Sequence, residues 1–170
     1  TESVNILGND FKLLKDFCIE HKLKLFIRFH PNNYIESRRK FAEYIDDETI
    51  IDLSPDMLDD VQDFLPQTDI LITDFSSVSR DFLFLDRPMI FVTKGLDNTE
   101  DNCLPIREEF AFCGYTVETV EQLNQSIQEI ISGEDKYREV RSFMKKLTYN
   151  YIDDKACMRV ANLIDGWNNL

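Results

Sequence analysis

Four short apolar segments of this chain each end in residues that can bind or activate a ligand. The segments are LKLFIRF (23–29), TIIDL (49–53), DILIT (69–73) and PMIFV (88–92). At or just beyond their ends stand, in turn, Arg28, His30, Pro31 and Asn32; Asp52 and Ser54; Thr73, Asp74, Ser76 and Ser77; and Thr93, Lys94 and Gly95. Histidine titrates near neutral pH, and hydroxyl, lysine and backbone N–H groups hold anions. The pattern predicts a site for an anionic ligand.

His30 is one of two histidines in the chain. Pro31 restricts it to an extended conformation, so its side chain is held where the segment ends. One interpretation is a general acid or base, or a donor to phosphate. The alternative is a histidine that bonds a neighbouring carbonyl at the end of a strand. His21 needs no functional role, because a cation in the last turn of a helix is favoured by the helix dipole.

The turn Asp74-Phe75-Ser76-Ser77 comes directly before a predicted helix marked by Val78, Phe82 and Leu85. Free N–H groups at a helix start, together with serine hydroxyls, make an anion site. Asp74 or Ser76 as a plain N-cap is the commoner reason for such residues. The two roles are compatible. Asp81 on the same helix is either an exposed ion-pair partner or a buried, hydrogen-bonded carboxylate.

The elements that must position these residues alternate along the chain. Helical spacing marks segments 9–21, 34–45 and 57–65, and after a short strand at 115–117 it marks three late helices. Apolar strands that alternate with amphipathic helices predict an α/β fold, Rossmann-like, with a parallel sheet and helices on both faces. Such sheets bind ligands outside the carboxyl ends of their strands. We expect one domain over 1–170 with an irregular segment at 93–113. The chain enters on a helix, without the strand expected before it.

Composition narrows the classes of function. The net charge of −13 over 170 residues argues against a nucleic-acid partner, and 43% hydrophobic residues suffice for a core. The cysteines form no CxxC pair, so no metal site is expected. We expect Cys18 and Cys157 to be core thiols, and Cys103 and Cys113 to be reduced. No signal peptide or membrane-spanning run is recognised, which favours a cytoplasmic protein with at most peripheral membrane contact.

The segments RFHPN and TDILITDFSSVSRDFLFLDRPMIF, about forty residues apart, resemble the CDP-glycerol glycerophosphotransferase family of teichoic-acid primases and polymerases. TVETVEQLNQSI (116–127) and YIDDKACMRVANLI (151–164) resemble later parts of the same family, so the resemblance runs in order over roughly 23–165. Phe75 stands in place of the usual tyrosine, and Arg80 where a hydrophobic residue is common. The loop 93–113 lacks the usual Asp-x-x-Tyr signature.

The resemblance implies the C-terminal, nucleotide-donor half of a glycosyltransferase-B architecture, with the N-terminal acceptor domain absent. It implies His30 as a catalytic residue and CDP-glycerol as the donor substrate, with no further cofactor. The same family implies a polymer or lipid-linked acceptor, and we expect the isolated half to have little or no transferase activity. The substrate-binding set is Arg28, Pro31, Asn32, Ser54, Thr73, Asp74, Ser76, Ser77, Asp81 and Lys94.

Three alternatives stay open. A glycosyltransferase or epimerase of the same architecture would use a nucleotide sugar instead of CDP-glycerol. A phospho-receiver-like module would need an acidic cluster after the first strand, where this chain has His-Pro. A non-catalytic module would keep the fold without the chemistry.

Overall fold

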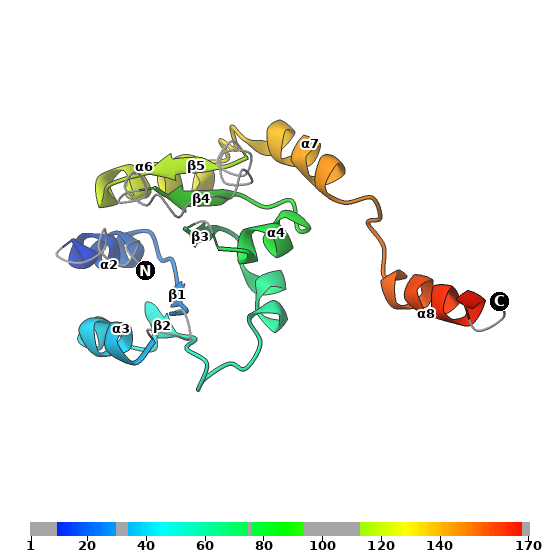
Figure 1. Cartoon of the computed structure of the whole chain (residues 1–170). Coiled ribbons are helices and arrows are strands. Elements are labelled where there is room, and N and C mark those ends of the chain that lie inside the picture. The colour runs from blue at the N-terminus through cyan, green and yellow to red at the C-terminus, as the bar shows by residue number, and fades with distance from the viewer. Residues whose placement is uncertain (1–9, 30–33, 75, 94–112, 168–170) are drawn as a thin grey trace, which may run out of the picture.

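The computed structural model describes residues 10–29, 34–74, 76–93 and 113–167. In chain order the elements are α2 (Phe11–Glu20), β1 (Leu25–Ile27), α3 (Tyr34–Phe41), β2 (Ile50–Asp52), the 3-10 turns η1 (Val61–Asp63) and η2 (Leu65–Gln67), β3 (Leu71–Thr73), α4 (Val78–Leu83), β4 (Met89–Val92), β5 (Tyr115–Val117), α6 (Val120–Ile131), α7 (Arg138–Thr148) and α8 (Ala156–Trp167). Each predicted strand is present; the first four are shorter than their apolar runs, and the one at 115–117 has the predicted bounds. The predicted α/β fold with parallel strands and flanking helices is confirmed (Figure 1).

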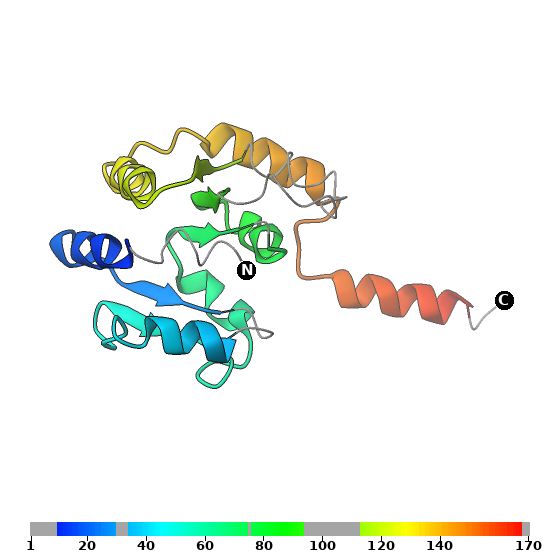
Figure 2. The same ribbon diagram turned by 60° about the vertical axis from the view of Figure 1, so that its left-hand side comes forward.

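The strands form two parallel ladders rather than one continuous sheet. β1 pairs with β2, so that Phe26 lies opposite Ile51. β3, β4 and β5 form the second ladder, with Ile72 opposite Ile90 and Phe91 opposite Thr116. Among the described residues no pairing joins β1 to β3. In both views β1 and β3 are the strands through which the two ladders face each other (Figures 1 and 2).

Strand β4 divides two hydrophobic cores, one on each of its faces. Ile90 and Val92 belong to a cluster with α2 and α6, which includes Phe11, Leu14 and Leu123. The alternate residues Met89 and Phe91 belong to a second cluster with α4 and α7, which includes Phe82, Leu83 and Met144. All four β4 residues are buried. Side chains that alternate between two buried faces are the signature of a strand covered by helices on both sides.

Gly114 sits against β4 where no side chain fits. A Cβ at this position would lie 2.4 Å from the Met89 carbonyl oxygen and 2.8 Å from the Phe91 ring. The glycine therefore permits the close approach that lets β5 begin at Tyr115. The Tyr115 hydroxyl then donates to the Glu134 carbonyl oxygen at 2.8 Å, which fastens β5 to the chain beyond α6.

Helix α7 is fastened to the end of α4 by polar contacts. Arg141 is 1% exposed and pairs with Asp135 (Nη2–Oδ2 2.7 Å) and Asp86 (Nε–Oδ1 3.1 Å). Burial lowers the pKa of Arg141, but the two carboxylates outweigh this effect and raise its pKa above the ordinary value. Lys145 donates to the Phe84 carbonyl oxygen at 2.6 Å, and the Tyr149 hydroxyl donates to the Arg80 carbonyl oxygen. We call this set the α7 clamp.

Two expectations about the helices are wrong. Residues 57–65 form 3-10 turns and not a helix, because the carbonyl oxygens of Leu58 and Asp59 accept hydrogen bonds from Arg28 instead of from a following helical turn. Cys157 is exposed, since no residue of α8 is buried, whereas Cys18 is a core thiol as predicted.

No helix in the described part of the chain combines the length and apolar character needed to cross a bilayer. The irregular segment 93–113 falls almost entirely outside the described residues.

Candidate functional site

Arg28 leaves the end of β1 and reaches the loop that follows β2. Its Nη1 donates to the carbonyl oxygens of Leu53 at 2.7 Å and Leu58 at 2.6 Å. Its Nη2 donates to the Asp59 carbonyl oxygen at 3.1 Å. One guanidinium thus holds three backbone acceptors in place, which suits its planar array of five N–H donors. In this structure the predicted ligand-binding arginine shapes the loop after β2.

Asp52 and Ser54 form a closed polar unit directly after β2. Asp52 Oδ1 accepts from the Ser54 backbone N–H at 2.8 Å and also from the Ser54 hydroxyl. Asp52 Oδ2 lies 2.7 Å from Arg38 Nε, without the alignment of a hydrogen bond. Asp52 is 5% exposed and Ser54 is fully buried. The Ser54 hydroxyl, predicted to touch substrate, is therefore committed to a neighbouring carboxylate.

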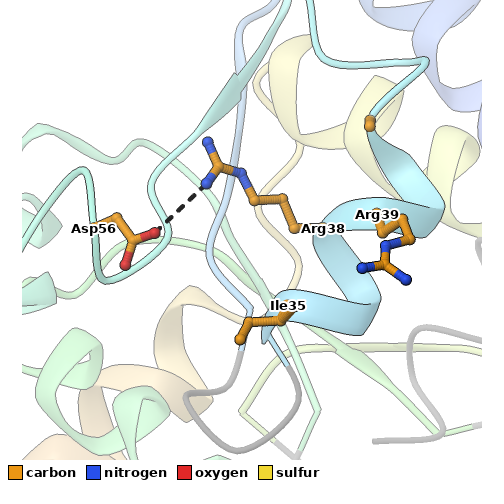
Figure 3. A pocket seen from close by; sticks show the side chains of 5 residues that line it. Ile35, Arg38, Arg39 and Asp56 are labelled. Atoms are coloured by element: carbon orange, nitrogen blue, oxygen red, sulfur yellow. Dashed lines mark ion pairs between the residues drawn. The ribbon is translucent and has the colours of Figure 1, made fainter.

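A shallow pocket of about 320 Å³ opens beside this unit. Helix α3 supplies its wall with Ile35, Arg38, Arg39 and Ala42, and Asp56 closes the opposite side. Figure 3 shows Arg38 extended toward Asp56, with Nη1 and Oδ2 3.5 Å apart, while Arg39 points away from that pair. Arg38 therefore bridges the two carboxylates of Asp52 and Asp56, one buried and one exposed.

The turn after β3 is more open. Ser77 is the N-cap residue of α4, and it is exposed, with a side chain that makes no capping hydrogen bond. The N-cap is thus neither Asp74 nor Ser76. The Ser76 carbonyl oxygen accepts from the Ser79 hydroxyl at 2.8 Å and from the Ser79 N–H at 3.2 Å. An anion here would have to use hydroxyls and the N–H groups that precede Ser79.

Asp81 lies in the first turn of α4 and is exposed. Its Oδ2 accepts a hydrogen bond from Gln62 Nε2 at 3.3 Å, which ties α4 to the η1 turn. Asp81 is thus exposed rather than buried, and its hydrogen-bond partner is the amide of Gln62 rather than a cation. Thr73 ends β3 and is half-buried, as is Asp74, which follows it in the turn.

Four predicted site residues, His30, Pro31, Asn32 and Lys94, lie outside the described residues, as does Phe75. The structure brings Arg28, Asp52 and Ser54 together at the β1–β2 exits, with Ser76, Ser77 and Asp81 on the neighbouring β3 exit. Sequence reasoning missed Arg38, which contacts both Asp52 and Asp56. The signal was Asp52 itself, since a carboxylate at the end of a buried strand needs a charged partner.

The thiols of the cores are poor candidates for chemistry. Burial raises the pKa of Cys18 and of Cys113 to about 11. Both are therefore protonated thiols at neutral pH, whereas the thiolate is the nucleophile. In the described ranges no cluster of histidine, cysteine and carboxylate side chains could hold a metal ion.

Comparison with known proteins gives a consistent result. The family model described as CDP-Glycerol:Poly(glycerophosphate) glycerophosphotransferase matches residues 2–166. Teichoic acid ribitol-phosphate polymerase TarK of Staphylococcus aureus is 26% identical over 158 residues, which are 89% of this chain and 28% of TarK. A solved structure of the wall teichoic acid polymerase TagF superposes with a TM-score of 0.57 at 19% identity, over 96% of this chain and 50% of that one. This chain thus spans half or less of the relatives it matches.

Proposed function

This chain belongs to the CDP-Glycerol:Poly(glycerophosphate) glycerophosphotransferase family, and from that premise we propose that it is the donor-binding half of such an enzyme. The observation that carries this proposal is the family match over 2–166, which includes every strand exit where ligand-binding residues are predicted. The fold supports the assignment, because open parallel sheets bind nucleotides at the carboxyl ends of their strands. The polymer would be teichoic-acid-like, as the names of both relatives suggest.

The proposed reaction transfers glycerol phosphate from CDP-glycerol to an acceptor hydroxyl. The acceptor oxygen forms a bond to the phosphorus that carries the glycerol, and the bond from that phosphorus to the CMP oxygen breaks. The hydroxyl proton passes to a base, a role for which we propose His30. Phosphoryl transfer depends mainly on positioning and on neutralising charge in the transition state. The exposed Ser77 and its neighbour Ser76 are proposed to hold the diphosphate.

The described geometry divides the predicted binding residues into two roles. Arg28 and Ser54 donate hydrogen bonds to oxygen atoms of the protein itself, so we propose that they shape the loop after β2. Ser77 makes no capping bond and is exposed, so its hydroxyl is available to a ligand. The acceptor domain and a polymer or lipid-linked acceptor belong to the rest of the proposed enzyme. Its proposed place is the cytoplasm, at the inner face of the membrane.

Calorimetric titration of the full-length protein with CDP-glycerol tests the donor assignment. Replacing both Ser76 and Ser77 by alanine should weaken binding at least tenfold, because charge-assisted hydrogen bonds to phosphate are lost. Ser142→Ala on α7 is the matched control and should leave the affinity unchanged. Equal affinity of the double variant and the parent would contradict the site. Tighter binding of a UDP-sugar than of CDP-glycerol would favour the nucleotide-sugar alternative.

A second experiment addresses the reaction itself. His30→Ala in the full-length protein should abolish transfer, and unchanged transfer would exclude His30 as the base. The chain 1–170 alone should bind the donor without turning it over. Full turnover of CDP-glycerol by this chain without added protein would contradict the division into two halves.

A further inference from the structure

The pocket beside the β2 exit is lined by two arginines whose N–H donors the protein leaves unused. In the part of the chain that the structure describes, Arg38 makes ion pairs but its side chain donates no hydrogen bond. The Arg39 side chain makes neither kind of contact there. Four other arginines do donate to oxygen atoms of the protein, namely Arg28, Arg87, Arg141 and Arg159. A guanidinium holds five N–H donors in a plane that matches a phosphate or carboxylate, so this pocket is equipped for an anion.

Arg38 is held in position by the protein itself. The carboxylate of Asp52, which is buried, lies 2.7 Å from Arg38 Nε. The Arg38 side chain is nevertheless 42% exposed, and its Nη1 lies 3.5 Å from the Asp56 carboxylate, too far for a hydrogen bond. Its terminal nitrogens therefore keep their donors for a ligand. A side chain that is already fixed loses less conformational entropy when the ligand binds.

The other groups in the pocket indicate what kind of anion fits. Ile35 and Ala42 lie on the same face of α3 as the two arginines, and they offer carbon surface. Asp56, on the opposite side, is exposed and can accept hydrogen bonds from hydroxyl groups. None of the described residues that line the pocket is aromatic, so none of them can stack on a nucleobase. Phosphate, hydroxyl groups and a carbon chain together describe a polyol phosphate.

The distribution of charge favours a polyanion on this side of the molecule. Residues 10–45, which include α2 and α3, contain eight lysines and arginines against five acidic residues. Residues 46–170 contain 11 against 26. Most of the chain therefore repels a polyanion, and the local excess of positive charge attracts it to α3. Arg39 points away from the pair of Arg38 and Asp56 (Figure 3), so the two guanidiniums can bind different phosphates of one chain.

The pocket also lies near the predicted donor site. Helix α3 follows the exit of β1 and Asp56 follows the exit of β2, and these paired strands are parallel, so both exits are at one edge. The serine-bearing turn follows β3, which faces β1 in both views (Figures 1 and 2). The β1 exit thus separates the pocket from that turn.

Resting on the proposed function, we propose that this pocket is a subsite for an interior stretch of the polyol-phosphate polymer, away from its reacting end. Arg38 and Arg39 bind phosphodiester oxygens of successive units, and Asp56 accepts a hydrogen bond from a hydroxyl group between them. From the pocket the polymer extends along the strand exits toward the serine-bearing turn. The subsite holds the polymer and takes no part in the transfer step.

Fluorescence anisotropy of the full-length protein with a labelled chain of glycerol phosphate units tests the subsite. The terminal hydroxyl of this chain is methylated, so that it cannot act as an acceptor. Arg39→Gln should weaken binding about tenfold, because charge-assisted hydrogen bonds are lost. Lys40→Gln is the matched control and should weaken binding less than about twofold, since Lys40 is exposed on the same helix but does not line the pocket. Equal losses in the two variants would overturn the inference, and so would unchanged binding by Arg39→Gln.

A second variant blocks the pocket without removing an arginine. Ala42→Glu places a carboxylate at helical spacing from Arg38 and Arg39, where it competes with phosphate for both. Binding of the glycerol-phosphate chain should again weaken about tenfold. Arg39 and Ala42 are both exposed, so the thermal unfolding of the two variants should match that of the parent. Unchanged binding by Ala42→Glu would overturn the inference.

Two further titrations separate this inference from its alternatives. If the parent binds CDP-glycerol but its affinity for the polymer does not depend on Arg39, the subsite is wrong and the proposed function stands. If the parent binds the polymer but not CDP-glycerol, the proposed function is contradicted. Vesicles of phosphatidylglycerol present the same phosphate chemistry on a membrane. Binding that depends on Arg39 and is tighter for these vesicles than for the glycerol-phosphate chain would overturn the polymer as the ligand.

Discussion

The exits of β2 and β3 carry similar polar residues and use them differently. After β2, Asp52 and Ser54 are buried and bonded to each other, and Arg38 and Arg28 complete a network of protein contacts. After β3, Ser77 is exposed and caps nothing, and Asp81 makes one long hydrogen bond to Gln62. Polar residues at strand ends thus fall into those that maintain the loops and those that remain for a ligand. The two groups predict opposite effects of mutation on stability and on binding.

The largest loss of stability is expected for Asp52→Ala. The substitution leaves the buried Ser54 hydroxyl and N–H without their acceptor and removes the partner of Arg38. Buried groups left unpaired cost about 1–3 kcal/mol each, so the free energy of unfolding should fall by about 2–3 kcal/mol in denaturant titrations. Asp56→Ala, which removes an exposed carboxylate, should change it by less than about 0.5 kcal/mol. Equal effects of the two substitutions would remove the distinction between the exits.

A smaller loss is expected for Arg28→Met. The aliphatic part of the side chain is kept, but the three carbonyl oxygens of Leu53, Leu58 and Asp59 lose their donor. Because these acceptors are partly exposed and can be hydrated, the unfolding free energy should fall by about 1–2 kcal/mol. The affinity for CDP-glycerol should fall only if the loop after β2 moves. Loss of donor binding with unchanged stability would place Arg28 among the ligand-binding residues.

Ser77→Ala should show the reverse pattern. The side chain makes no capping bond. The free energy of unfolding, measured by thermal denaturation, should therefore fall by no more than about 0.5 kcal/mol, less than the ~1 kcal/mol typical of a lost N-cap. CDP-glycerol affinity, measured by calorimetry on the full-length protein, should fall by about threefold to tenfold. Ser79→Ala is the matched control, because its hydroxyl is occupied by the Ser76 carbonyl. A loss of stability without a loss of affinity would assign Ser77 to the helix.

The smallest effect is a pH dependence on the β2 side. The Lys15 ammonium, and then the N–H groups of Ile50 and Thr49, hold the pKa of Asp46 well below its ordinary value of 3.8. Because the folded-state pKa is the lower one, this stabilisation is complete above the ordinary pKa and is lost as the pH falls below it. Asp46→Asn should therefore destabilise the protein at pH 7 more than at pH 3. An equal effect at both pH values would contradict the assignment.

The strands could be predicted because each is an apolar run bounded by polar residues, and Tyr115–Val117 was placed to the residue. The helix expected at 57–65 fails because Arg28, about thirty residues away, takes the carbonyl oxygens of that segment. The role of Arg38 could not be predicted for the same reason, since its partner Asp52 lies on another element. Local periodicity encodes which face of a segment is apolar. It does not encode which distant side chain will compete for its backbone.

The α7 clamp sets a boundary for protein engineering. Arg141, Lys145 and Tyr149 contact α4 and the residues just after it, whereas no residue of α8 is buried. A fusion partner or fluorescent label attached beyond residue 150 would therefore leave both cores and the serine-bearing turn untouched. A cut before Arg141 would instead remove the cation that Asp86 and Asp135 share. It would also remove the hydrogen bonds that Lys145 and Tyr149 donate to Phe84 and Arg80. The α7 clamp, which ends at Tyr149, thus separates a tail that tolerates modification from the helix that the clamp holds in place.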